Sequence, residues 1–147
     1  MAAYLFLPKH GAPPYQTVIY HPGCDALQSR SREKMGVSLI FFEFLMLSGR
    51  AVLFPVYEGS YERHIDLGGI LAKREMSIQE VKDAARSVDY LEIRADIDHR
   101  RIAFYGLSWG ADRGARICGT ENRFKTCVLL GRGWLPFRGR PKWTGST

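Results

Sequence analysis

A serine between two glycines is the residue of this chain whose surroundings most clearly suggest chemistry. The segment Gly106-Leu107-Ser108-Trp109-Gly110 follows an apolar, β-prone run and precedes a segment with a helical pattern. This Gly-x-Ser-x-Gly order is typical of a nucleophile elbow, in which a strained strand-to-helix turn exposes the serine hydroxyl. The two glycines carry no Cβ, so the helix can pass close to the strand. The turn also places Ser108 at a helix N-terminus, where free N–H groups favour developing negative charge.

The elements that would position this serine alternate along the chain. Short apolar, β-prone runs occupy 3–7, 16–20, 51–56, 101–107 and 126–130. Helices are expected at 37–47, at 77–91, where Ser77 and Glu80 form a capping box, and at 109–119. Polar or glycine-containing connections are expected at 25–34, 57–74 and 96–100. The alternation predicts an α/β fold, with a mostly parallel sheet and helices on both faces.

Loops at the carboxyl ends of such strands form the ligand site of an open α/β sheet. Three connections are therefore expected at one edge: 21–25, 57–63 and the turn at Ser108. His21 has two interpretations at this edge. It could act as a base by proximity, or it could shape its loop through hydrogen bonds, and the second interpretation is favoured.

The positive charge of the chain is concentrated near one end. The net charge is +6, and residues 132–147 hold four basic residues and no acidic one, which leaves +2 (6 − 4) for residues 1–131. A Gly-, Arg- and Trp-rich segment of this kind resembles a nucleic-acid-binding tail in miniature. An unfolded or out-of-frame ending explains the same composition and is favoured, so we do not expect nucleic acid as a partner.

The cysteines and the apolar runs restrict the class of protein further. Cys24, Cys118 and Cys127 are odd in number and widely spaced, and no CxxC pair occurs. This pattern predicts reduced thiols in a cytoplasmic protein and argues against a disulfide framework or a zinc site. The longest apolar run, 37–47, falls well short of the roughly 20 residues of a membrane helix. We therefore expect no membrane span, and the first nine residues lack the features of a signal peptide.

Three stretches together resemble one known family. Tyr20-His21-Pro22-Gly23 follows one predicted strand, Phe54-Pro55-Val56-Tyr57-Glu58-Gly59 follows the next, and the Ser108 turn follows the run at 101–107. In this order the chain resembles the α/β-hydrolase superfamily, in particular its dienelactone hydrolase and prolyl oligopeptidase-type serine peptidase domains, over about residues 3–131. The resemblance implies a serine hydrolase that cleaves a small ester or peptide through an acyl-enzyme on Ser108, with no metal or organic cofactor.

The resemblance also implies backbone roles around the serine. The N–H of Trp109 would be one donor of the oxyanion hole, and the second would come from Gly23 or Cys24. Donors of this kind each stabilise the transition state by about 2.7 to 4 kcal/mol.

One departure from the family pattern bears on activity. In this superfamily the acid and the histidine follow the nucleophile. Here all four histidines precede Ser108, and only Asp112 and Glu121 are acidic residues that follow it. We therefore expect an incomplete α/β-hydrolase fold that lacks the last strands: a partial domain at 1–131 and a basic tail at 132–147 that is disordered or out of frame.

Two alternatives remain open beside the hydrolase. The chain could be a non-catalytic remnant or binding module, in which the exposed apolar edge at 126–130 invites self-association. It could also bind nucleic acid through the basic tail, which is the less favoured of the two.

Overall fold

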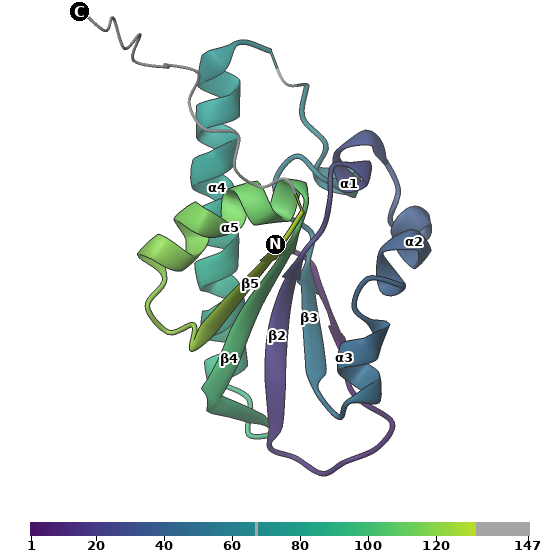
Figure 1. Cartoon of the computed structure of the whole chain (residues 1–147). Coiled ribbons are helices and arrows are strands. Elements are labelled where there is room, and N and C mark those ends of the chain that lie inside the picture. Colours follow the sequence, from purple (N-terminus) through teal and green to yellow (C-terminus); the bar gives the residue numbers. More distant parts are fainter. Residues whose placement is uncertain (67, 132–147) are drawn as a thin grey trace, which may run out of the picture.

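A five-stranded sheet in the order β1-β3-β2-β4-β5 forms the centre of the molecule (Figure 1). The computed structural model describes residues 1–66 and 68–131. Its strands are β1 (Ala3–Phe6), β2 (Tyr15–His21), β3 (Ala51–Pro55), β4 (Ile97–Leu107) and β5 (Thr126–Leu130). Strands β2 to β5 pair in parallel, and β1 runs antiparallel to β3. The predicted mostly parallel sheet is confirmed.

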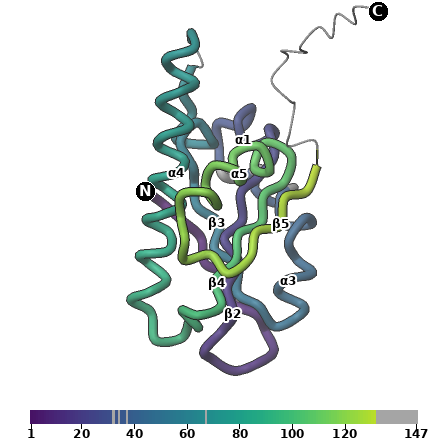
Figure 2. The backbone as a smooth tube through the Cα atoms, turned by 60° about the vertical axis from the view of Figure 1, so that its left-hand side comes forward, coloured from purple at the N-terminus to yellow at the C-terminus, as the bar shows by residue number. Residues whose placement is uncertain are grey.

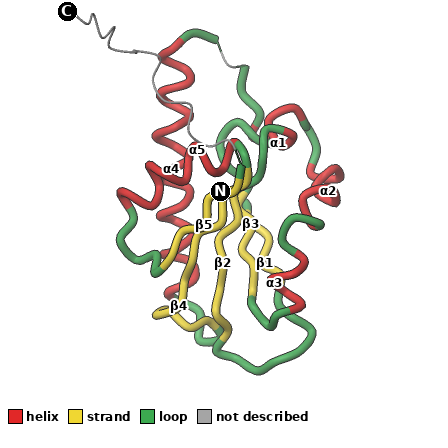
Figure 3. Tube along the Cα trace, in the orientation of Figure 1, coloured by secondary structure: helices red, strands yellow, loops and turns green. Residues whose placement is uncertain are grey.

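Helices cover both faces of this sheet, as the alternation predicted (Figure 3). The long helix α4 (Ile70–Glu92) and α5 (Trp109–Thr120) lie on one face. The short helices α1 (Asp25–Gln28), α2 (Gly36–Leu39) and α3 (Glu43–Leu47) lie on the other, with the 3₁₀ turns η1 (Arg32–Met35) and η2 (Tyr61–Arg63). The connection predicted at 25–34 therefore contains a helix, α4 begins inside the predicted loop at 57–74, and β4 begins inside the connection predicted at 96–100.

Alternating side chains of the central strands build a separate core on each face. Ile19 and Leu53 pack with Val88 of α4 and Ile117 of α5, and all four are buried. Their neighbours in the strands turn to the other face and join an aromatic cluster beneath α1 to α3, made of Tyr20, Phe42, Phe54, Tyr61 and Tyr105. Residues i and i+2 of a strand share a face, so β2 and β3 must be buried on both sides to serve both cores.

The segment 37–47 is not the single helix that the sequence predicts. The helix is interrupted at Phe42, whose φ of −135° and ψ of 0° lie outside the helical region. The ring of Phe42 is fully buried and lies 4.9 Å from that of Tyr20 and 5.5 Å from that of Phe6, measured between centroids. Packing of this ring outweighs helix continuity, so α2 and α3 form two short helices instead of one.

The capping box predicted at Ser77 does not begin a helix. Helix α4 begins at Ile70, so Ser77 lies inside it, and its hydroxyl donates to the carbonyl of Lys73 at 2.9 Å. Serine hydroxyls make such bonds four residues back within helices. Glu80, the other member of the predicted box, is buried and turns towards α5.

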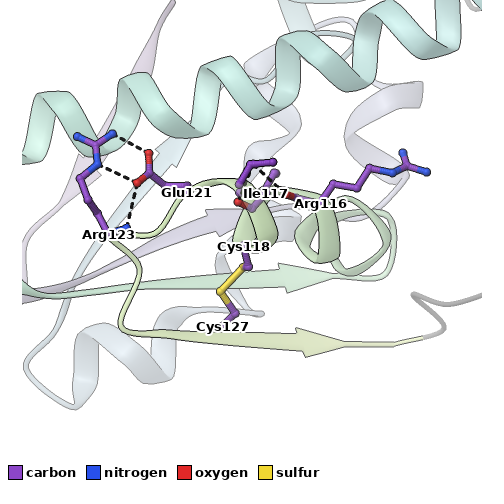
Figure 4. The surroundings of a disulfide bond; sticks show 7 residues. Arg116, Ile117, Cys118, Glu121, Arg123 and Cys127 are labelled. Atoms are coloured by element: carbon purple, nitrogen blue, oxygen red, sulfur yellow. Dashed lines mark hydrogen bonds and ion pairs between the residues drawn. A yellow bond between two sulfur atoms is a disulfide. The ribbon is translucent and has the colours of Figure 1, made fainter.

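A disulfide between Cys118 and Cys127 corrects the prediction of reduced thiols. Cys118 lies near the end of α5 and Cys127 in β5, and their Cα atoms are 6.6 Å apart (Figure 4). Because α5 packs back along β5, it brings together two residues that look unrelated in the sequence. Cys24 is free and exposed.

Strand β5 forms an edge of the sheet among the described residues (Figure 2). Val128, Leu129 and Leu130 are 42–52% exposed, which agrees with the apolar edge expected at 126–130. Within the described residues, no helix is long and apolar enough to cross a membrane. The tail predicted at 132–147 lies outside the described residues.

Candidate active site

Ser108 occupies a strained turn between β4 and α5. Its φ of 52° and ψ of −103° are unusual for a residue with a side chain, and such backbone strain is concentrated at functional sites. The flanking glycines are required by close packing. A Cβ on Gly110 would lie 2.3 Å from the carbonyl oxygen of His21, and one on Gly106 would lie 2.3 Å from that of Gly110. Ser108 itself is exposed, so the turn presents it to solvent.

Of the backbone N–H groups of Ser108, Trp109 and Gly110, the first and the last donate hydrogen bonds to other segments. The N–H of Ser108 donates to the carbonyl of Leu130 at 2.7 Å, and that of Gly110 donates to the carbonyl of Pro22 at 3.0 Å. The N–H of Trp109 belongs to the first residue of α5, which has no carbonyl one turn earlier within its helix. Trp109 is therefore the position whose amide is best placed to stabilise negative charge next to Ser108.

The turn after β2 lies directly against the serine. A Cβ built on Gly23 would be 3.7 Å from Cβ of Ser108 and 3.9 Å from the carbonyl oxygen of Leu107. Cys24 follows as the residue before α1, with an exposed side chain. The structure thus brings together Ser108, Trp109 and Gly23, the residues predicted to surround the serine, at the carboxyl edge of the sheet.

His21 is engaged in other contacts beneath this turn. Its Nδ1 lies 3.2 Å from the carbonyl oxygen of Pro22, which also accepts the bond from Gly110. Its ring stacks on Tyr57, with 4.0 Å between centroids, and its Nε2 lies 3.7 Å from Glu80. The ring is buried. These contacts support the interpretation that His21 shapes the loop.

The two acidic residues that follow Ser108 both face arginines. Glu121 accepts bonds from Arg123 at 2.6 and 2.8 Å (Figure 4). These bonds hold the pKa of the Glu121 carboxyl below its ordinary value. Asp112 lies 3.7 Å from Arg113. Neither arrangement joins an acid to a histidine.

A buried cluster that sequence reasoning missed supports the first turn of α5. Glu80, 1% exposed, accepts a hydrogen bond from Nε1 of Trp109 at 3.1 Å. Its Oε2 lies 3.1 Å from Nε of Arg113, as an ion pair without good hydrogen-bond alignment. The Arg113 guanidinium lies over the Trp109 ring, 3.8 Å from its centroid. Glu80 of α4 thereby fixes the side chain of the residue that directly follows Ser108.

A second group of charges shapes the loop after β3. Arg63 donates to Asp83 of α4 at 2.6 Å and to the carbonyl of Val56 at 2.7 Å, and it also bonds Glu58. Asp83 accepts the backbone N–H of Glu58 at 3.0 Å. Because these bonds tie the loop to α4, Glu58 and Arg63 are held in a network and are not simply solvated. Within residues 1–66 and 68–131, no cluster of three or more His, Cys, Asp or Glu could hold a metal ion.

Comparisons with known proteins agree with this arrangement. No family model matches the chain. Among solved structures, an acetyl xylan esterase from Paenibacillus sp. R4 matches with a TM-score of 0.62 and 21% identity, over 86% of this chain and 43% of that one. Est1E from Butyrivibrio proteoclasticus, solved with ferulic acid bound, matches with a TM-score of 0.61 and 21% identity, over 87% and 47%.

An α/β hydrolase from Penicillium sp. sh18 matches with a TM-score of 0.59 and 15% identity, over 85% of this chain and 39% of that one. The chain thus spans less than half the length of each of these three structures. Together with the sheet order and the turn at Ser108, these matches show that the chain has the α/β-hydrolase fold over the part of that fold that it spans.

Proposed function

We propose that this chain carries the nucleophile and the oxyanion donors of a serine hydrolase. The observation that carries the proposal is the exposed Ser108 on its strained turn, directly before the first residue of α5, Trp109, and in contact with Gly23. The Ser108 hydroxyl attacks the acyl carbon of the substrate, and the two backbone donors stabilise the oxyanion that forms. Collapse of that intermediate breaks the ester C–O bond, leaves an acyl-enzyme on Ser108 and releases the alcohol, which takes its proton from water.

An ester is the preferred substrate class within this proposal. The structures that this chain is similar to include an acetyl xylan esterase and a glucuronoyl esterase from Solibacter usitatus. A peptide bond is the second choice, because its amine leaving group needs a general acid that Ser108 and its backbone donors do not supply. The closer assignment to the dienelactone hydrolase or prolyl oligopeptidase type stays a prediction from the sequence. The proposed chemistry needs no cofactor.

The expected rate depends on which group accepts the proton of the Ser108 hydroxyl. All four histidines precede Ser108 in the sequence, and His21 is held by Pro22, Tyr57 and Glu80. We therefore expect this chain by itself to pass the proton to water. Serine hydrolases that lose a member of the triad keep a residual acceleration of about 10³ to 10⁴ over water, from the oxyanion hole and binding alone.

Labelling with a fluorophosphonate probe tests this function. We expect intact-mass analysis and peptide mapping to find one adduct, on Ser108, and Ser108→Ala to abolish it. Ser48→Ala is the matched control, because this exposed serine lies on a bend after α3. Equal labelling of the Ser108→Ala variant would refute the proposal. Release of nitrophenol from a nitrophenyl ester, with and without Ser108, gives the residual rate.

A binding module is the second candidate function, and the exposed strand β5 favours it. Val128, Leu129 and Leu130 leave an apolar edge beside unpaired backbone groups, which invites pairing with another strand. Self-association through this edge predicts an average mass that rises with concentration and falls back in a Val128→Lys variant. A monomer at every concentration would count against it.

Two further predictions from the sequence belong with these candidates. Nucleic-acid binding through residues 132–147 is the least supported, and it predicts salt-sensitive binding that deletion of these residues removes. The cytoplasmic location also stays a prediction. The Cys118–Cys127 disulfide weighs against it, because disulfides persist mainly in oxidising compartments.

A further inference from the structure

A groove of about 920 Å³ lies between α4 and α5, away from the turn at Ser108. The two helices lie against each other on one face of the sheet (Figures 1 and 2). One hydrogen bond joins the groove's walls, from Nη1 of Arg113 in α5 to the hydroxyl of Ser77 in α4, at 2.8 Å. The volume is within the range of about 300–1,000 Å³ typical of small-molecule sites.

Three apolar side chains line one part of this groove, which we call its floor. Ile70, Ile78 and Val81 of α4 line it, and Ile70 is 83% exposed. Covering branched side chains of this kind removes apolar surface from water, which is favourable for any ligand with a hydrocarbon body.

Cationic side chains line another part of the groove, which we call its rim. They are Lys73, Arg74, Lys82, Arg113 and Arg116, of which Arg113 is buried. No acidic residue of the described chain lines it. Arg113 is paired with Glu80, whereas the structure records no ion pair for the other four within the described residues. Unpaired cations around an apolar floor favour a ligand with a negative charge.

Two of these cations repel each other. Arg113 and Arg116 are three residues apart on α5, so they lie on neighbouring positions of one helix face. Burial lowers the pKa of the Arg113 guanidinium, Glu80 and Asp112 raise it, and the charge of Arg116 lowers it further. An anion between the two guanidinium groups would replace lost hydration and relieve this repulsion.

The charge of the chain restricts what can occupy the groove. Residues 132–147 carry four basic residues and no acidic one, and a second copy of the chain brings a net charge of +6. The cations of the rim would repel both the segment 132–147 and a second copy of the chain.

We propose that the α4–α5 groove binds an amphiphilic carboxylate from solution, with its hydrocarbon chain on the isoleucine and valine floor and its carboxylate among the cations of both walls. This site is independent of the proposed hydrolase function.

Dodecanoate, kept below its micelle concentration, is the probe for this site. We expect saturable one-to-one binding by calorimetry, with an affinity that falls as salt is raised, because salt screens the cations of the rim. Acetate carries the same charge without the chain, and dodecyltrimethylammonium carries the same chain with the opposite charge. Both should bind at least ten-fold more weakly.

Trp109 supplies a second readout, because the Arg113 guanidinium lies 3.8 Å from its ring centroid. In a background with Trp134→Phe and Trp143→Phe, dodecanoate should change the emission of Trp109. The Lys82→Glu/Arg116→Glu variant should lose at least ten-fold in affinity. The Arg100→Glu/Lys125→Glu variant makes the same charge change at exposed positions outside the groove and should bind as the parent does.

Several results would overturn the proposal. Equal binding of dodecyltrimethylammonium would mean that the groove selects only for apolar surface. Equal losses in both double variants would mean that net charge, and not the groove, attracts the probe. Binding to anionic vesicles with none to monomeric dodecanoate would assign the cations to a membrane surface. Absence of saturable binding in a folded protein would refute the site outright.

Discussion

Replacing Gly110 with alanine tests the close packing on which the Ser108 turn depends. The added Cβ would lie 2.3 Å from the carbonyl oxygen and 2.8 Å from the carbonyl carbon of His21, whereas real Cβ atoms stay beyond 3.0 Å. Both contacts are to backbone, so no side chain can move aside. The first turn of α5 must therefore shift away from β2, and the 3.0 Å bond from Gly110 to Pro22 must stretch.

The expected loss follows from three terms. Alanine is favoured over glycine inside a helix by about 1 kcal/mol. Overpacking of a tight contact costs about 1–3 kcal/mol, and a buried donor left without its partner costs about 1–3 kcal/mol. We therefore expect Gly110→Ala to lower the free energy of unfolding by about 1–5 kcal/mol, and for a chain of this size each kcal/mol lowers Tm by about 2–4 °C.

Two other glycines of the same helix are matched controls. A Cβ on Gly119 meets nothing within 4 Å, so Gly119→Ala should stabilise the protein by about 0.5–1 kcal/mol. A Cβ on Gly114 would lie 2.4 Å from a methyl group of Leu129 and 2.7 Å from the ring of Phe104, so its effect should be intermediate. Urea unfolding of the three variants gives the order. Equal stability of Gly110→Ala and Gly119→Ala would refute the steric argument.

Three further predictions concern the disulfide and the buried charges. Cys118→Ser opens the disulfide loop and should lower stability by about 2–3 kcal/mol; a reducing agent should do the same to the parent and nothing to the variant. Glu80→Ala leaves Arg113 buried without its partner and should cost about 3–5 kcal/mol, whereas Glu80→Gln keeps an acceptor for the indole and should lose less. Similar unfolding midpoints for the two would contradict this. The folded-state pKa of Glu121 is depressed by Arg123, so its stabilisation is present above the ordinary carboxylate pKa and is lost as the pH falls through the folded value. In acid unfolding, the free energy of unfolding of Arg123→Ala should therefore fall less steeply below about pH 4.5 than that of the parent. The same pH dependence in both proteins would exclude this linkage.

The strands could be predicted from the sequence because a short stretch of residues already shows the apolar pattern of a buried strand. Thr126–Leu130 begins and ends as predicted, β3 ends one residue earlier than predicted, and β2 is one residue longer at each end, whereas β4 begins at Ile97 and not at residue 101. Alternation of apolar side chains is visible within five residues, and so is the glycine pattern around Ser108. The approach of Gly23 to Ser108 also follows from local order, because consecutive parallel strands bring their carboxyl ends to one edge.

The predictions from the sequence were wrong where contacts between residues far apart in the sequence determine the local structure. Phe42 leaves the helical region because its ring packs among rings from three strands. Helix propensity depends on the local sequence and contains no information about this packing. Glu80 looks like a capping residue in its own segment, but its partners are 29 and 33 residues later. The thiols of Cys118 and Cys127 meet only because α5 turns back along β5. Counting cysteines cannot reveal that geometry.

The hydrogen bond from Ser108 to Leu130 makes the edge strand part of the support of the strained turn. The ladder between β4 and β5 runs up to Leu107 and Leu130, and this bond extends it by one residue, onto the strained position itself. The unfavourable backbone of Ser108 is thus held by the cooperativity of the sheet and not by the turn alone. Transient fraying of β5 would release that strain, and the serine would relax towards an ordinary loop.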